Sequence, residues 1–151
     1  LPLGTSAPLF ELPDQNGELL SLTELTKNHF VVLSFYMKDN GASCMAMMEA
    51  FMDDIDAFQE LNACFVAINP ESVESHHEFC EQVVKYRVRL LSDVDKSVSK
   101  AYKALVFGGF AIDRTVYVID QQGVIQYAKR GMPDVNEILS VLRKIKPYAY
   151  S

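Results

Sequence analysis

The sequence predicts an α/β fold with a central mixed β-sheet flanked by helices, and three observations carry that prediction. Residues 29–36 (HFVVLSFY) and 63–68 (ACFVAI) are short runs of apolar, β-branched and aromatic residues, as expected of buried central strands. A helical pattern lies between them, which predicts a parallel crossover. Residues 115–120 (TVYVID) and 124–129 (VIQYAK) flank QQG, which predicts a closing antiparallel hairpin with Gly123 at a positive φ.

The helix between the two buried strands is predicted from its apolar spacing. Ser43 stands at the N-cap position, which places Cys44 in the first turn of a helix of about four turns. Acidic side chains occupy the opposite face. The apolar positions recur at intervals of three and four and comprise Cys44, Met47, Met48, Phe51, Ile55 and Phe58.

The remaining elements follow from turn and cap signals. Residues 1–25 contain three prolines and the turn sequence DQNG at residues 14–17, which predicts a hairpin-like N-terminal extension. SHHE at residues 75–78 is a capping-box pattern before a helix, and a shorter helix is expected over residues 96–104. A C-terminal helix starts near Pro133. This order of strands and helices is that of a thioredoxin-like fold.

Composition limits the domain organisation and the classes of partner. The 151 residues with 49% hydrophobic content are about the size of one domain, so residues 1–151 are expected to form a single unit. The net charge of −6 disfavours nucleic acid and anionic membrane surfaces as partners. No leader-like segment and no apolar run of roughly 18 residues is present, which predicts a cytoplasmic protein without a membrane anchor.

The three cysteines raise the question of thiol chemistry. Cys44, Cys64 and Cys80 are an odd number without zinc-ligand spacing, which argues against a disulfide scaffold. A thiolate at a helix N-terminus faces unpaired backbone N–H groups and the positive end of the helix dipole, and both lower the pKa of the thiol. Position alone leaves two interpretations of Cys44 open, a nucleophile or a thiol buried in the core. Cys64, within a predicted buried strand, is interpreted as structural.

Residues 35–44 (FYMKDNGASC) resemble the active-site segment of the peroxiredoxins, F-Y-P-K-D-N-T-P-G-C in its usual form. Further resemblance extends through GTSAPLFELPDQNGELLSLTEL, INPESVESHHEF, LLSDVDKSVSKAY and DRTVYVIDQQGVI, which together cover nearly the whole chain. The sequence is therefore identified as similar to the AhpC/TSA superfamily, and most similar to its bacterioferritin comigratory protein or peroxiredoxin Q subfamily, with a degenerate active-site motif. The matching motif positions are Phe35, Tyr36, Lys38, Asp39, Asn40 and Cys44.

The resemblance implies a thiol peroxidase and assigns residues to its steps. Cys44 corresponds to the peroxidatic cysteine, which attacks a hydroperoxide and becomes a sulfenic acid. Arg114 corresponds to the arginine that stabilises the thiolate and the developing negative charge. Cys80 is the candidate resolving thiol, although it could equally pack as a core residue. The active-site loop comprises Tyr36, Lys38, Asp39, Asn40, Gly41 and Ser43.

The implied partners are small molecules and a protein reductant. A hydroperoxide is the substrate, and thioredoxin or a similar dithiol regenerates the enzyme. The resemblance implies a monomer or a homodimer and no metal, haem or flavin. His76 and His77 lie close to Cys80 in sequence but do not complete a metal-ligand set.

Departures from the motif support an alternative function. The proline, the threonine and the Pro-Gly pair of the motif are replaced by Met37, Gly41 and Ala42-Ser43. The threonine hydroxyl orients the peroxide, and glycine supplies no equivalent group. The alternative is thus a catalytically weakened redox sensor or binding protein. A dithiol reductase is disfavoured because Met47 stands where the second cysteine of a C-x-x-C pair would be.

Overall fold

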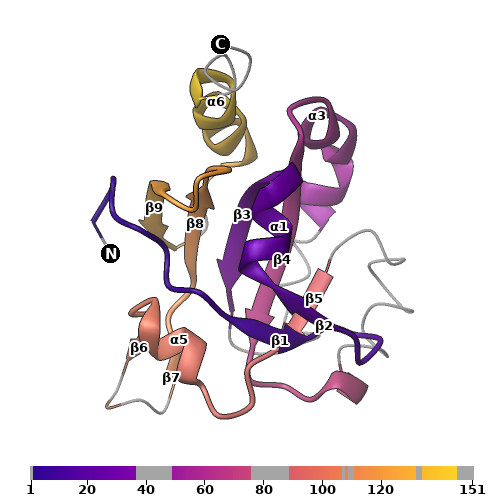
Figure 1. Cartoon of the computed structure of the whole chain (residues 1–151), viewed down its shortest axis with the longest axis vertical. Helices are drawn as coiled ribbons and strands as arrows, with labels where there is room; N and C mark the ends of the chain where they lie inside the picture. The colour runs from indigo at the N-terminus through magenta and orange to yellow at the C-terminus, as the bar shows by residue number, and fades with distance from the viewer. Residues whose placement is uncertain are drawn as a thin grey trace.

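A five-stranded mixed sheet in the order β5-β4-β3-β8-β9 forms the centre of the protein, as the sequence predicts (Figure 1). In this computed structural model, the described residues are 2–36, 49–75, 89–106, 108, 111–131 and 134–145. β3 pairs in parallel with β4 and antiparallel with β8, while β5 is parallel to β4 and β9 antiparallel to β8. The strands are β3 (Phe30–Phe35), β4 (Ala63–Asn69), β5 (Arg89–Ser92), β8 (Thr115–Ile119) and β9 (Ile125–Arg130).

Alternate residues of the central strand enter two hydrophobic cores. All six residues of β3 are buried, and five of them are apolar or aromatic. Val32 joins a core that α3 (Ile55–Glu60) and α6 (Val135–Ile145) cover, whereas Val31 and Leu33 join the core beneath α1 (Leu22–Asn28) and α5 (Ser97–Ala101). The continuous apolar run is therefore explained by burial on both faces.

The predicted N-terminal hairpin is confirmed as β1 (Glu11–Pro13) paired antiparallel with β2 (Leu19–Ser21). Its turn is organised by Asp14, whose Oδ1 accepts the backbone N–H groups of Asn16 and Glu18, while Gly17 adopts φ +81°. The Nη1 of Arg89 donates to Asp14 Oδ2 at 2.8 Å, which fixes the hairpin against β5. Asp14 is fully buried.

The chain before β1 lies along the turn between β8 and β9. The N–H groups of Gly4 and Ala7 donate to the carbonyls of Ile125 and Gly123, each at 2.8 Å. In return, the Ile125 N–H donates to the Thr5 carbonyl at 2.9 Å. This N-terminal segment therefore covers the beginning of β9, which is an edge strand of the main sheet.

The expected four-turn helix after Ser43 is interrupted. Residues 49–53 are helical, Asp54 is a turn residue with φ −109° and ψ 17°, and α3 begins at Ile55. The Asp54 N–H donates to the Phe51 carbonyl three residues back, which tightens the backbone at this point. The single continuous helix was wrong at Asp54, and the first part of that prediction, residues 43–48, lies outside the described residues.

Several elements differ from the sequence prediction in their limits. α1 was not predicted, although SLTE at residues 21–24 is a capping-box sequence and the Ser21 hydroxyl accepts the Glu24 N–H at 3.2 Å. The helix expected over residues 96–104 is the shorter α5, which ends before Lys103 adopts a left-handed φ of 56°. β5 and the small pair β6 (Leu105–Val106) and β7 (Ala111–Ile112) were also not predicted.

Of the remaining predictions from cap and turn signals, the C-terminal helix and the hairpin glycine are confirmed, and the SHHE helix begins earlier than predicted. Residues 73–75 are helical, and the Ser72 hydroxyl accepts the Ser75 N–H at 3.1 Å, so helical structure begins before the predicted SHHE box. The remainder of the predicted helix falls within residues 76–88, which lie outside the described residues. α6 is confirmed, with Val135, Ile138, Leu139 and Leu142 buried as their spacing predicts. Gly123 adopts φ +79°, also as predicted.

Candidate functional site

The carboxyl end of β3 brings together the two described residues of the predicted active site. Phe35, the last residue of β3, is paired with Thr115, the first residue of β8. Tyr36 follows β3 and Arg114 precedes β8, so both residues lie at the same end of the sheet. The other predicted site residues lie outside the described residues, namely Cys44, Cys80, Lys38, Asp39, Asn40, Gly41 and Ser43.

Tyr36 belongs to the hydrophobic core at the point where the chain leaves the sheet. Its side chain is fully buried within the core beneath α3 and α6. Its N–H donates to the Ile68 carbonyl of β4 at 3.1 Å, so the parallel hydrogen bonding continues one residue beyond β3. The position from which the Cys44 segment departs is therefore held by both backbone and side chain.

Arg114 is half-buried at the start of the closing hairpin. Its carbonyl accepts the Gly131 N–H at 2.7 Å, which extends the β8–β9 pairing by one step, and its Nε atom is buried from solvent. The next residue is fixed as well, because the Thr115 hydroxyl donates to the Asp113 carbonyl at 2.8 Å. A permanently charged, planar donor with a fixed backbone can stabilise an anion at this end of the sheet.

Cys64 lies away from this end of the sheet. Cys64 pairs with Val31 in the parallel β3–β4 register. Val31 lies four residues before Phe35, so Cys64 is about 13 Å along the strand from the end of β3 where the candidate site lies. It is half-buried at a separate pocket of about 300 Å³ whose lining also includes His29 and Arg89. Burial raises the pKa of the Cys64 thiol to about 12, which keeps it protonated at neutral pH. These features fit the structural role predicted from sequence.

No metal site is apparent in the part of the chain that the structure describes. Within it, no group of three or more His, Cys, Asp or Glu side chains is placed to hold a metal ion. His76 and His77 lie outside that part.

No helix among the described residues is long and apolar enough to cross a bilayer.

Known proteins resemble the chain over most of its length. A family model described as the AhpC/TSA family matches residues 3–128. The chain belongs to the AhpC/TSA family. It is 35% identical over 131 residues to the putative peroxiredoxin bcp of Coxiella burnetii, covering 83% of this chain and 85% of that protein. It is 34% identical over 149 residues to the chloroplastic peroxiredoxin Q of Sedum lineare, covering 95% and 78%.

The fold of this peroxiredoxin is shared with solved structures of the family. Peroxidoxin BcpB from Mycobacterium tuberculosis superimposes with a TM-score of 0.88 at 28% identity, over 96% of this chain and 98% of that one. The predicted thioredoxin-like fold is therefore confirmed, as is the resemblance to the bacterioferritin comigratory protein and peroxiredoxin Q group. Peroxiredoxins are thiol peroxidases, so the chain belongs to a family of enzymes.

Sequence reasoning missed the backbone partner of Arg114. Gly131 follows β9 and adopts φ +92°, and its N–H holds the Arg114 carbonyl. The sequence carried only part of the signal. The predicted hairpin around QQG puts Arg130 opposite Arg114, and the register shift between Val118 and Ile119 moves this pairing by one residue to Gly131. Gly131 thereby fixes the backbone of the candidate catalytic arginine.

Proposed function

We propose that this peroxiredoxin reduces hydrogen peroxide or organic hydroperoxides through Cys44. The Cys44 thiolate attacks the terminal peroxide oxygen, the O–O bond breaks, and the thiol becomes a sulfenic acid while water or an alcohol leaves after protonation. The observation that carries this proposal is the Phe35–Thr115 pairing, because it puts Arg114 at the end of the sheet where the Cys44 segment leaves β3.

Arg114 is proposed to stabilise the reacting groups electrostatically. The thiolate carries a full negative charge, and the transition state spreads this charge over the sulfur and both peroxide oxygens. A guanidinium in a desolvated site stabilises both species without a change in its own protonation. The half-buried position of Arg114 and its fixed backbone support this role.

Regeneration is proposed to use Cys80 and an external dithiol. The Cys80 thiolate would attack the Cys44 sulfenic acid, forming a disulfide and releasing water. Thioredoxin or a similar dithiol would then reduce this disulfide and itself become oxidised. Because a disulfide requires Cα atoms within roughly 7 Å, trapping a Cys44–Cys80 bond would show that the two segments approach during the cycle.

A catalytically weakened redox sensor is the second candidate function, and the presence of Gly41 in the active-site motif favours it. The family motif has a threonine at this position, and its hydroxyl contacts the peroxide. Glycine has no side chain, so another group would have to make this contact. Gly41→Thr distinguishes the two functions. A large rise in the oxidation rate of Cys44 would support the sensor, and an unchanged rate would support an enzyme that is already efficient.

The experiment that tests the proposal is stopped-flow oxidation of the reduced protein by hydrogen peroxide and by an organic hydroperoxide, followed by peptide mapping. Cys44→Ser should abolish rapid peroxide consumption, Cys80→Ser should leave the sulfenic acid unresolved, and Cys64→Ser should have neither effect. Full activity in Cys44→Ser would refute the assignment of the nucleophile. A normal intramolecular disulfide in Cys80→Ser would refute only the assignment of the resolving thiol.

A further inference from the structure

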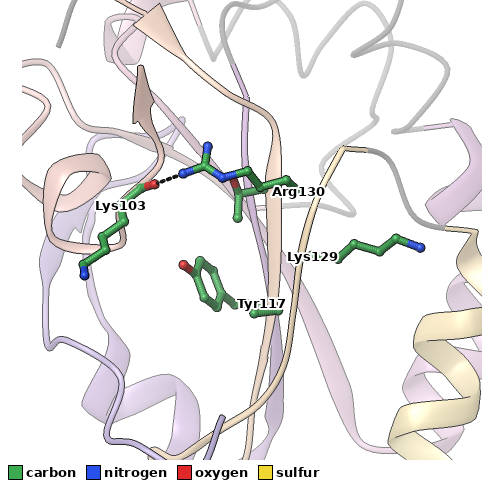
Figure 2. Close-up of a pocket in the computed structure, with 6 residues that line it drawn as sticks. Lys103, Tyr117, Lys129 and Arg130 are labelled. Atoms are coloured by element: carbon green, nitrogen blue, oxygen red, sulfur yellow. Dashed lines mark hydrogen bonds between the residues drawn. The ribbon is translucent and has the colours of Figure 1, made fainter. Parts of the chain in front are cut away.

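Arg130 joins two separate segments of the chain beside Arg114, the candidate catalytic arginine. Its Nη1 donates to Asp113 Oδ2 at 2.8 Å, and its Nη2 donates to the Lys103 carbonyl at 2.7 Å (Figure 2). Asp113 directly precedes Arg114, and Lys103 lies two residues after α5. One guanidinium at the end of β9 therefore holds both the chain after α5 and the residue before Arg114.

The same contacts close the base of the small β6–β7 pair. Lys103 lies two residues before β6, and Asp113 directly follows β7. The Asp113 N–H donates to the Ala104 carbonyl at 2.8 Å, which continues the β6–β7 hydrogen bonding by one step. Lys103 adopts a left-handed φ of 56°, which is unfavourable for a residue with a Cβ atom, and its hydrogen bond to Arg130 helps to hold that conformation. The two ends of the β6–β7 pair thus meet at Arg130.

The backbone on each side of Arg114 is held from the end of β9. The Gly131 N–H donates to the Arg114 carbonyl at 2.7 Å, and Arg130 is the residue before Gly131. Arg130 pairs with Thr115 in the β8–β9 register, and its side chain returns to Asp113. The segment around Arg114 therefore receives contacts from two consecutive residues. Without the Arg130 guanidinium, the Gly131 contact would remain and the Asp113 side chain would be released.

Arg130 and Arg114 lie on opposite faces of the sheet. Successive side chains of a strand point to opposite faces, and here Val116 enters the core that α3 and α6 cover, whereas Tyr117 enters the core beneath α1 and α5. Arg130 pairs with the residue before Val116 and therefore shares the face of Tyr117 (Figure 2). The same alternation places Arg114 on the face of Val116, which is also the face of the buried Tyr36. The influence of Arg130 on the candidate site must therefore pass through the backbone that carries Arg114.

We propose that Arg130 is a positioning residue for the candidate catalytic Arg114. It acts through its contacts to Asp113 and Lys103. This role rests on the proposed function of Arg114, which is to stabilise the Cys44 thiolate and the transition state of peroxide cleavage. Electrostatic stabilisation depends on where the donor lies, and a misplacement of about 1 Å costs up to about 100-fold in rate. Because the backbone contacts of Arg114 remain, loss of the Arg130 guanidinium should slow the reaction less, by about tenfold.

The contribution of Arg130 to global stability should be small. The side chains of Arg130 and Asp113 are 51% and 46% exposed, and exposed ion pairs add little to the free energy of unfolding. Arg130→Gln should therefore fold normally, which urea denaturation checks. A clear loss of rate with little loss of stability is the result that a positioning role predicts.

The test is a double-mutant cycle on the full chain, with the rate of Cys44 oxidation by hydrogen peroxide measured by stopped flow. Arg130→Gln alone should slow oxidation about tenfold. Because Arg130 acts through Arg114, the same change made in Arg114→Gln should slow oxidation by less than about twofold. A rate in Arg130→Gln within about twofold of the unmodified chain would overturn the proposal, and so would an equal fold loss in the two backgrounds.

The cycle also separates this proposal from the proposed function. If Arg114→Gln leaves the rate unchanged, the catalytic role of Arg114 is refuted, and the positioning role of Arg130 is refuted with it. If Arg114→Gln slows the reaction and Arg130→Gln does not, only the positioning role is refuted.

Lys129→Gln is the matched control. Lys129 is the neighbouring residue of β9, its Nζ lies 3.2 Å from a Glu137 carboxylate oxygen, and its side chain runs toward α6 (Figure 2). This variant also loses one positive charge and one exposed ion pair, but it leaves the contacts to Asp113 and Lys103 intact. Its oxidation rate should stay within about twofold of the unmodified chain. A loss of rate equal to that of Arg130→Gln would overturn the proposal.

The pH dependence of Cys44 alkylation gives a readout that a purely structural role would not change. A less well placed Arg114 stabilises the thiolate less, so Arg130→Gln should raise the apparent pKa of Cys44. Arg114→Gln should raise this pKa further, and Lys129→Gln should leave it unchanged. Iodoacetamide labelling with mass spectrometry measures the rate at each pH. A raised Cys44 pKa in Arg114→Gln with an unchanged one in Arg130→Gln would contradict the positioning role.

Discussion

Phe35 and Thr115 lie opposite each other across the antiparallel β3–β8 pair, at the end of the sheet where the candidate active site is placed. Tyr36 follows the last residue of β3 and Arg114 precedes the first residue of β8, so both residues lie just beyond this pair at the same end of the sheet. β4 runs parallel to β3 on its other side, and the Ile68 carbonyl of β4 accepts a hydrogen bond from the Tyr36 N–H. The geometry of the candidate site thus depends on the mixed character of the sheet.

The first prediction concerns Arg114. Arg114→Gln should slow oxidation of Cys44 by hydrogen peroxide by about 100-fold to 1,000-fold, because a preorganised donor to a developing anion is lost. Stopped-flow kinetics gives the rate. Arg143→Gln, at an exposed position of α6, is the charge-matched control and should leave the rate unchanged. A rate in Arg114→Gln within threefold of the unmodified protein would exclude a catalytic role.

Cys64 should be resistant to alkylation at neutral pH. Its pKa, raised by burial to about 12, leaves almost no thiolate at pH 7, so labelling should accelerate about tenfold per pH unit through pH 8–10. Because the folded pKa exceeds the unfolded one, this thiol contributes stability that is present below pH 9 and decreases as pH rises toward 12. Iodoacetamide labelling with mass spectrometry measures the rate. Rapid labelling of Cys64 at pH 7 would contradict the burial argument.

Replacing Asp14 should lower the free energy of unfolding more than replacing its salt-bridge partner, Arg89. Asp14→Ala removes a buried acceptor of two backbone N–H groups and of Arg89, and should lower the free energy of unfolding by about 2 to 3 kcal/mol. Arg89→Gln should cost less than half as much, because the Arg89 side chain is 50% exposed and water can replace it. Urea denaturation measures both. Glu11→Ala, an exposed carboxylate on the same hairpin, is the control.

The contact between β9 and α6 should depend on pH. The Tyr127 hydroxyl donates to the Glu137 carboxylate, and this bond, followed by the one from Lys129, lowers the Glu137 pKa from its ordinary value of 4.5. A lowered folded pKa gives stability that is present above pH 4.5 and lost as pH falls through the folded pKa. Tyr127→Phe should raise the Glu137 pKa, measured by carboxylate NMR titration. Lys129→Gln should raise it less, and the reverse order would contradict the assignment.

The sheet was predictable because its strands carry strong local patterns. The runs around Val32 and Val66 are apolar on both faces, and the hairpin has its turn glycine at Gly123, so local sequence and fold agree. β5 and α1 were harder to predict. β5 has four residues and becomes a strand by pairing with β4, and α1 has seven residues that gain stability from packing of Leu22.

The candidate site was predictable only in part. Arg114 could be placed because it directly precedes a clear strand. The approach of the chain after α5 to the β8–β9 hairpin could not be predicted, since it depends on hydrogen bonds to the carbonyls of Tyr102 and Lys103 from residues more than ten positions away in sequence. The break at Asp54 also carries no proline or glycine signal. Such features arise from tertiary contacts that periodicity does not encode.

The N-terminal segment has a practical consequence for handling the protein. Its hydrogen bonds to Gly123 and Ile125 satisfy backbone groups at the start of an edge strand. Removal of the first seven residues would expose those groups to other molecules. An uncovered strand edge is a template for intermolecular pairing, so a shortened chain is expected to self-associate and to lose solubility at high concentration. Tags and truncations at this end therefore affect colloidal behaviour even where the core and the candidate site are unchanged.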